Sequence, residues 1–231
     1  MIYSKHPVHH RARMSAPNES FLVPLREAGF RVSWVPKVAG VDVKVGRDEA
    51  ITRLLPHHEA AASALGAVDG QFWRCEQVHG NLTLPVRGTY QPELTTGADG
   101  LATSDPDAVL GVYVADCGAL YIGDPVQRAV AVVHSGKVGT EKNILGATIA
   151  MMQREYDSSP SDLIVSLAPC IRPPAYEVDF AAQIRQQALA AGVLDSHYYD
   201  CDLCTTSDPD CYYSYRQEQG QTGRMLALIA V

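Results

Sequence analysis

Short apolar runs, each about the length of a buried β-strand, recur along this chain and constrain its fold more than any other feature. Residues 109–115 (VLGVYVA) and 129–133 (AVAVV) are almost wholly apolar and too short for typical helices. Residues 72–78, 163–167 and 222–231 are expected to form further strands. The pattern therefore predicts a core built on β-sheet.

Helical segments are predicted between these strands. Residues 49–65 are rich in Ala and Leu and predict a first helix, and residues 180–191 predict another. Thr140 is expected to cap a third helix over about residues 141–156, after a glycine-containing turn that offers backbone N–H groups to an anion. Strands interleaved with helices indicate one mixed α/β unit.

Length and composition indicate one globular domain. A chain of 231 residues is long enough to enclose a full hydrophobic core, and 46% apolar with 19% charged residues is typical of a folded protein. Residues 1–18 are polar and are expected to form a flexible N-terminal tail. Residues 19–231 are expected to form a single catalytic domain.

The charge balance limits the classes of partner. Lys and Arg number 19 against 26 Asp and Glu, a net charge of −7, so the chain lacks the basic excess of a general nucleic-acid binder. We find no run of about 18 apolar residues and no apolar block of signal-peptide length near the N-terminus. We expect a soluble cytoplasmic protein that binds neither nucleic acid nor membrane.

Three reactive side chains stand at the ends of predicted strands: His79, Cys117 and His134. Their separations of 38 and 17 positions exclude the local spacing of a zinc finger, whereas dispersed ligands with an open fourth position are typical of a catalytic metal site. Two imidazoles and one thiolate suit zinc and also copper. From spacing alone, hydrogen-bonded structural histidines and a buried cysteine remain the commoner arrangement.

A longer set of motifs surrounds these residues. They are Gln77-Val78-His79-Gly80, Ala98-Asp99-Gly100, Ala115-Asp116-Cys117, Val133-His134-Ser135-Gly136, Pro169-Cys170-Ile171, Tyr176-Glu177-Val178, Cys204-Thr205, Ser214-Tyr215-Arg216 and Thr222-Gly223-Arg224. Together they cover about residues 70–231 and resemble, in order, the signature of the YfiH-like family. Members of that family are variously named polyphenol oxidase (laccase) domain or purine nucleoside phosphorylase.

The resemblance implies a fold and an activity. The fold would be α+β, with packed mixed β-sheets flanked by helices, distantly shared with the deamidase domain of cytotoxic necrotizing factor. The family's metal ligands fall on His79, Cys117 and His134. The implied enzyme is a zinc-dependent purine nucleoside phosphorylase with adenosine deamination as a companion activity, acting on a purine nucleoside and phosphate. Copper-dependent oxidation of phenols has also been ascribed to the family.

Deamination would need a carboxylate to shuttle a proton beside the metal, because water must attack C6 of adenine. Glu177 is the first predicted catalytic carboxylate, followed by Asp99 and Asp116. For each of them, an ordinary hydrogen bond at the surface or at a strand end remains the alternative.

Phosphate needs cationic clamps, for which Lys137 and Arg216 are predicted, with Gln77 as a further substrate-binding residue. The family usually has His-Ala-Gly-Trp-Arg-Gly where residues 134–139 of this chain are His-Ser-Gly-Lys-Val-Gly. Lys137 keeps a positive charge at this loop but lacks the bidentate geometry of arginine. The sequence therefore predicts phosphate-dependent cleavage that persists but is slow.

Other classes of function stay open on the sequence. A metal-free hydrolase would use Cys117 as the nucleophile and His134 as the base, with no role for His79. The altered loop at Lys137 favours a homologue that binds metal or nucleoside with weakened turnover. A copper phenol oxidase is favoured least, because no Met stands near the three ligand motifs to act as a long axial ligand.

Overall fold

The computed structural model describes residues 19–88 and 94–231, so the predicted tail of residues 1–18 lies outside the described residues. Two β-sheets form the centre of the described structure. One has the order β1–β10–β5–β2, with β1 Arg31–Val35, β10 Met225–Ala230, β5 Leu110–Val114 and β2 Trp73–Arg74. The other has the order β3–β4–β7–β6–β8–β9, with β3 Thr83–Pro85, β4 Gly100–Thr103, β7 Ala129–Ser135, β6 Gly118–Asp124, β8 Ile164–Leu167 and β9 Tyr198–Asp200.

Helices lie mostly outside the two sheets. The longer ones are α2 Arg47–Ala64, α4 Ile144–Tyr156 and α5 Phe180–Ala190, and the short ones are α1 Val23–Glu27 and α3 Lys137–Glu141. Single 3₁₀ turns are η1 Ser20–Leu22, η2 Val68–Gly70, η3 Pro160–Asp162, η4 Asp195–His197 and η5 Thr205–Ser207.

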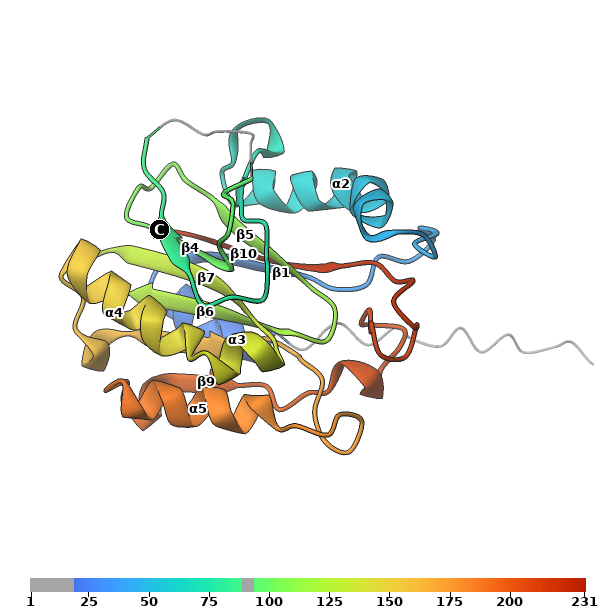
Figure 1. Cartoon of the computed structure of the whole chain (residues 1–231). Coiled ribbons are helices and arrows are strands. Elements are labelled where there is room, and N and C mark those ends of the chain that lie inside the picture. The colour runs from blue at the N-terminus through green and yellow to red at the C-terminus, as the bar shows by residue number, and fades with distance from the viewer. Residues whose placement is uncertain (1–18, 89–93) are drawn as a thin grey trace, which may run out of the picture.

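The elements stack in four layers (Figure 1). The sheets face each other across an apolar cluster that includes Trp34 and Val112 from one sheet and Tyr121 and Val132 from the other. Helix α2 packs on the outer face of the first sheet, and α4 and α5 cover the outer face of the second. Parallel and antiparallel pairs occur in both sheets. The predicted α+β fold with packed mixed sheets flanked by helices is confirmed.

Burial on both faces explains the apolar runs in the sequence. Every residue of β5, β6, β7 and β10 is buried, because each strand has the facing sheet on one side and helices on the other. The run at 129–133 therefore belongs to a longer strand, which continues through His134. The sequence predicted that this strand would stop at His134, and it ends one residue later, at Ser135.

Two further details differ from expectation. The predicted strand at 72–78 is reduced to β2, since the backbone turns left-handed at Gln77 with φ 62°. The predicted cap at Thr140 is wrong, because this residue lies inside α3. Helix α4 is capped instead by Asn143, whose side-chain oxygen accepts a hydrogen bond from the Gly146 N–H at 3.2 Å.

Strand pairing brings the predicted ligands to one place. Strand β6 pairs antiparallel with β7 so that Gly118 lies opposite Ser135, which sets Cys117 beside the end of β7. On the other side of β7, β4 begins directly after Asp99, and the His134 N–H donates to the Asp99 carbonyl at 2.7 Å. Three segments far apart in sequence thus meet at one edge of the second sheet.

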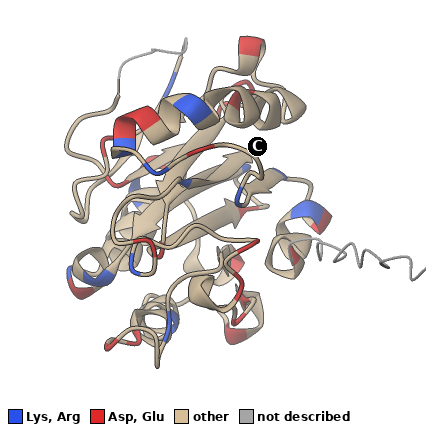
Figure 2. Ribbon diagram, turned by 90° about the vertical axis from the view of Figure 1, so that its right-hand side faces the viewer, with Lys and Arg blue, Asp and Glu red and all other residues tan. Residues whose placement is uncertain are grey.

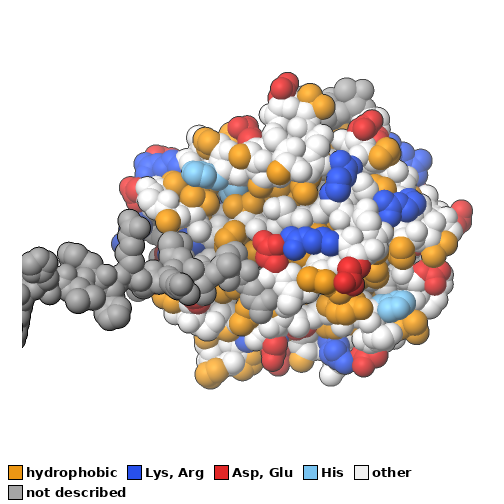
Figure 3. Space-filling model, turned by 180° about the vertical axis from the view of Figure 1, so that it is seen from behind, with side chains coloured by type: hydrophobic (Ala, Val, Ile, Leu, Met, Phe, Trp, Pro, Cys, Tyr) orange, Lys and Arg blue, Asp and Glu red, His pale blue; other side chains and the backbone are white. Residues whose placement is uncertain are grey.

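The surface carries mixed charge. Acidic and basic residues are interspersed along the helices and loops in Figure 2, and the face in Figure 3 mixes charged with apolar side chains. None of the helices in the described residues is both long enough and apolar enough to cross a membrane.

Candidate metal centre and its cavity

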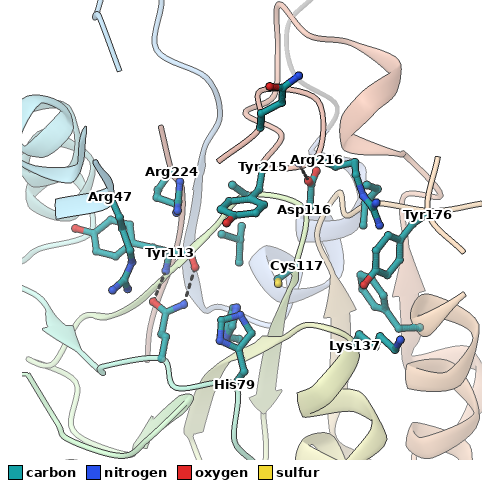
Figure 4. Close-up of a pocket in the computed structure, with 17 residues that line it drawn as sticks. Arg47, His79, Tyr113, Asp116, Cys117, Lys137, Tyr176, Tyr215, Arg216 and Arg224 are labelled. Carbon is teal, nitrogen blue, oxygen red and sulfur yellow. Dashed lines mark hydrogen bonds between the residues drawn. The ribbon is translucent and has the colours of Figure 1, made fainter. Parts of the chain in front are cut away.

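Three side chains with metal-ligating atoms converge at this edge: His79 from the loop before β3, Cys117 from the β5–β6 turn and His134 from β7. Their ligand atoms all lie within 4.8 Å of one another. The imidazole ring centroids are 4.8 Å apart, and the rings stand at 84°. His134 is buried, Cys117 half-buried and His79 exposed, so the cluster opens to solvent on the His79 side (Figure 4).

Asp99 links the two histidines. Its carboxylate, with no exposed surface, accepts hydrogen bonds from the backbone N–H of His79 at 2.8 Å and of Gly80 at 2.6 Å. The same carboxylate lies 2.9 Å from the His134 Nδ1. A carboxylate that accepts the Nδ1 proton leaves Nε2 of His134 as the free ligand atom, which is the usual arrangement behind a metal-bound histidine. Asp99 therefore orients the site.

The backbone at the site is specialised. Gln77, His79 and Asp116 have left-handed φ values of 62°, 59° and 80°, a conformation that costs side-chain-bearing residues about 1 kcal/mol or more. A Cβ on Gly136 would stand 2.6 Å from the Cys117 Sγ. The start of α3 can approach the thiol only because residue 136 is glycine.

Protonation in the cluster favours a charged pair. Burial raises the pKa of Cys117, but hydrogen bonds with His134 and His79 outweigh it and lower the pKa to about 6. Burial lowers the pKa of His134, but hydrogen bonds with Asp99 and Cys117 outweigh it and raise the pKa to about 9. Near neutral pH the metal-free cluster is thus a thiolate beside an imidazolium, with Asp99 behind the imidazolium.

The cluster lies in a cavity of about 700 Å³, within the size range of small-molecule sites. Arg47 and Arg224 line one side of the cavity, and Lys137 and Tyr176 line the other (Figure 4). Tyr215 lies over the cavity between these two sides. The cavity thus combines a ligand cluster with cationic and aromatic walls.

Glu177 does not line this cavity. Its carboxylate accepts a hydrogen bond from the Arg216 Nη2 at 2.9 Å, with both side chains more than half exposed. The Arg216 guanidinium also lies 4.9 Å from the ring centroid of Tyr176. Arg216 lines the cavity as predicted, whereas Glu177 is not brought to the ligand cluster, because it faces the surface ion pair.

Gln77 and Lys137 both line the cavity but differ in their contacts. The Gln77 amide donates to the Tyr113 carbonyl at 2.6 Å and accepts from the Tyr113 N–H at 2.9 Å. It therefore extends the hydrogen bonding of β5 and holds the His79 loop to that strand. Lys137 forms no ion pair within the described ranges 19–88 and 94–231.

Asp116 is fully engaged with the loops above the cavity. Its carboxylate accepts hydrogen bonds from the hydroxyls of Thr205 at 2.6 Å and Ser214 at 3.0 Å, and from the Arg216 N–H at 2.7 Å. These contacts tie the segment that carries Tyr215 to the residue before Cys117. Asp116 thus shapes the roof of the cavity.

Sequence reasoning missed two features of this cavity. Arg47 begins helix α2 and has the sequence context of an ordinary exposed helix residue, so nothing local marks it as a cavity residue. Tyr113 is a member of a buried strand run, yet it reaches the cavity wall. The TGR motif containing Arg224 was the available signal for the cationic side.

Comparisons with known proteins agree on one family. The family model described as multi-copper polyphenol oxidoreductase laccase matches residues 32–183 and 178–231. Purine nucleoside phosphorylase YlmD of Geobacillus stearothermophilus is 32% identical over an alignment of 192 residues, and the match covers 67% of this chain and 70% of that protein. The crystal structure of that organism's YlmD superposes with a TM-score of 0.78 at 27% identity, covering 88% of this chain and 92% of the other.

A second solved structure extends the likeness in fold. The hypothetical protein YfiH of Bacillus licheniformis superposes with a TM-score of 0.72 at 22% identity, covering 78% of this chain and 81% of that one. The family model spans most of the described domain, and the strand-end motifs lie inside the matched ranges. The chain therefore belongs to the family described as multi-copper polyphenol oxidoreductase laccase, the YfiH-like family.

Proposed function

We propose that this protein is a zinc-dependent purine nucleoside phosphorylase and that residues 19–231 form its catalytic domain. The observation that carries the proposal is the convergence of His79, Cys117 and His134, with ligand atoms within 4.8 Å, in a cavity of about 700 Å³. The name of the relative from Geobacillus stearothermophilus supports the nucleoside and phosphate as substrates.

The donor set fits zinc. Two imidazoles and a thiolate are ligands that zinc commonly takes, and three of them would leave one position for substrate. Asp99 behind His134 provides the carboxylate that zinc-binding histidines commonly have. A zinc ion held there would supply a fixed positive charge that polarises an atom of the substrate. Copper shares a preference for these ligands. Within the described residues there is one such cluster, whereas a multicopper centre needs several.

Phosphorolysis exchanges one bond at the sugar. The C1′–N bond of the nucleoside breaks and its electron pair goes to the purine nitrogen. A phosphate oxygen bonds to C1′, and the proton that hydrogen phosphate loses ends on the purine nitrogen. The chain's task is to hold both reactants and to exclude water. Lys137 and Arg216 offer positive charge to the reactants, Tyr176 and Tyr215 offer aromatic faces to the purine, and Gln77 keeps the His79 loop in place.

Adenosine deamination is the less favoured activity of the same site. It needs a carboxylate that is free to carry a proton, and the sequence predicts Glu177 and Asp99 for this role. Asp99 is saturated by its three hydrogen bonds, and Glu177 is paired with Arg216 outside the cavity. Asp116 is the acidic side chain among the described residues that line the cavity, and its carboxylate already accepts three hydrogen bonds. We therefore expect deamination to be slow relative to phosphorolysis.

One observation favours a second candidate, a metal-free thiol hydrolase. The candidate nucleophile is Cys117, with His134 as its base and Asp99 as the carboxylate that orients His134. The lowered pKa of Cys117 and the raised pKa of His134 leave the thiol as a thiolate at neutral pH. This candidate has no use for the His79 imidazole, which completes the metal cluster. Variants of His79 therefore separate the two candidates.

The experiment measures zinc content and product formation together. Chelator-free protein should hold one zinc per chain, and zinc-loaded protein should release purine from a nucleoside panel only when phosphate is present. Cys117→Ser should sharply weaken zinc binding and abolish release, whereas His57→Ala, on the exposed side of α2, should change neither. Tight zinc retained by Cys117→Ser would contradict the proposal.

The hydrolase is tested by His79→Ala. Our proposal expects this variant to lose zinc and phosphorolysis together. A thiol hydrolase would instead keep hydrolysing a nitrophenyl ester in chelator, and alkylation of Cys117 by iodoacetamide would inactivate it. Phosphate-independent turnover that survives His79→Ala would favour the hydrolase over the phosphorylase.

A further inference from the structure

Two guanidinium groups line one side of the cavity without an acidic partner. Arg47 donates from Nη2 to the Glu76 carbonyl at 3.4 Å, and Arg224 donates from Nη1 to the carbonyls of Thr222 and Gly223 at 2.9 Å each. Neither forms an ion pair with a carboxylate in the part of the chain that the structure describes. Both point into the same side of the cavity (Figure 4).

The two charges oppose each other. Burial lowers the pKa of Arg224, and the neighbouring positive charge of Arg47 lowers it further, against smaller opposing effects of Cys117, Tyr215 and Asp116. The exposed Arg47 and the half-buried Arg224 therefore repel each other, and an anion bound between them would relieve that repulsion. Guanidinium groups are also the side chains best suited to bind phosphate oxygens through paired N–H donors.

We propose that Arg47 and Arg224 form a subsite for a phosphoryl dianion in this cavity. Given the proposed phosphorolysis, on which this identification rests, the dianion is the phosphate co-substrate. The subsite lies across the cavity from Lys137 and Tyr176, with the His79 and Cys117 cluster between the two sides (Figure 4). Phosphate and purine then approach from opposite sides.

The other cavity cations are weaker candidates. Arg216 already pairs with Glu177 at 2.9 Å, and its guanidinium lies over the Tyr176 ring, so fewer of its donors are free for a dianion. Lys137 is a single ammonium on the aromatic side and binds phosphate oxygens without a bidentate fork. The subsite would therefore place the dianion on the wall opposite the altered 134–139 loop, where binding does not depend on the Lys-Val in that loop.

The experiment titrates zinc-loaded protein with inorganic phosphate, and separately with a nucleoside 5′-monophosphate, by calorimetry. Arg47→Gln and Arg224→Gln should each weaken binding about ten-fold or more, as expected for loss of a charged hydrogen-bonding group. Arg53→Gln is the matched control, because Arg53 lies on the same helix and pairs with Asp42 and Glu49 outside the cavity. Since Arg47 is exposed, its variant should fold normally.

Each outcome decides the proposal. It is supported if either probe binds the parent protein and binds more weakly to Arg47→Gln but not to Arg53→Gln. If inorganic phosphate responds, the ligand is free phosphate; if only the monophosphate responds, the ligand is the phosphate of a nucleotide. It is overturned if neither probe binds the parent protein, if Arg47→Gln binds as tightly as the parent, or if Lys137→Met alone removes binding.

Kinetics separate this inference from the proposed function. If the protein is a phosphorylase, Arg47→Gln should raise the KM for phosphate about ten-fold while the KM for nucleoside changes little. If the parent binds phosphate through these arginines but cleaves no nucleoside, the phosphorylase assignment fails and the subsite stands.

Discussion

Asp99 controls more of the candidate site than any of the three ligand side chains. A single buried carboxylate fixes the backbone at His79 and Gly80 and faces the Nδ1 of His134. The His79 backbone and the His134 imidazole are therefore held in place without a metal, which lowers the cost of ordering them on binding.

Replacing Asp99 by Asn should weaken zinc binding by about ten- to a hundred-fold, the usual cost of losing a carboxylate behind a metal-binding histidine. The amide keeps the size of the side chain but not its charge. Affinity is measured by competition with a chromophoric chelator, with the exposed Asp107→Asn as the control. Unchanged affinity in Asp99→Asn would remove this residue from the metal site.

The pKa shifts predict how zinc affinity depends on pH. His134 holds a proton below a pKa of about 9, and Cys117 is a thiolate above a pKa of about 6. Zinc must displace the His134 proton, so log affinity should fall by about one for each pH unit between about 9 and 6, and more steeply below. Affinity that stays flat from pH 8 to 5 would mean that these side chains are not ligands.

The sequence predicted that His79, Cys117 and His134 would converge, because each stands at the end of a predicted strand in a motif that resembles the YfiH-like family. It could not identify the part that Asp99 plays, because a carboxylate that shuttles protons and one that orients a histidine look the same in a motif. The burial of Asp99 and its three hydrogen bonds identify it as an orienting residue, and these contacts join segments that are far apart in the sequence. The sequence did not predict Arg47 as a cavity residue, because only the tertiary fold brings it to the same cavity as Arg224.

Among the elements, helix α2 carries a polar residue in its buried face. His58 has no exposed surface, and neither ring nitrogen has a hydrogen-bond partner among the described residues, while its ring centroid lies 5.3 Å from that of Tyr113. Burial lowers the pKa of His58 to about 4, and the nearby Arg224 backbone opposes this shift. His58 is therefore neutral in the folded protein.

Because the folded pKa lies below the ordinary value, the unfolded chain takes up the proton first as pH falls below about 6.5. The free energy of unfolding should thus lose about 2 kcal/mol from His58 between pH 7.5 and 5. In His58→Leu this part of the pH dependence should vanish, while the exposed His57→Leu should retain it. Urea unfolding at both pH values measures the difference, and equal losses in the parent and His58→Leu would refute it.

Several of the longer strands and helices lie where the sequence predicted them, but β6 was not predicted although it is buried along its whole length. Strands β5, β7, β8 and β10 and helices α2 and α5 all lie within predicted segments or within two residues of them. Strand ends were less accurate, because hydrogen bonding with distant partners sets them: β7 continues through His134 by pairing with β6. The division of residues 137–156 into α3 and α4 depends on Asn143 adopting a left-handed cap with φ 55°, which no local pattern specified.

At the scale of the whole molecule, the two facing sheets form the frame of the fold and the cavity lies at its edge. Composition and periodicity predicted a mixed α/β unit, while the resemblance supplied the more specific α+β arrangement of packed sheets. Periodicity alone could not assign ten strands to two sheets within the described residues, because strand order depends on contacts between segments far apart in sequence. Loops from both sheets meet at the cavity, so the site depends on the complete frame.

The central claim is phosphorolysis by the zinc-loaded protein, and ³¹P NMR of the reaction with a purine nucleoside tests it most directly. The account predicts a new ribose 1-phosphate signal that grows as inorganic phosphate falls, one mole for each mole of purine released, and no purine release without phosphate. The signal should be absent for Cys117→Ser. Purine release with phosphate unchanged and free ribose as the product would contradict the account.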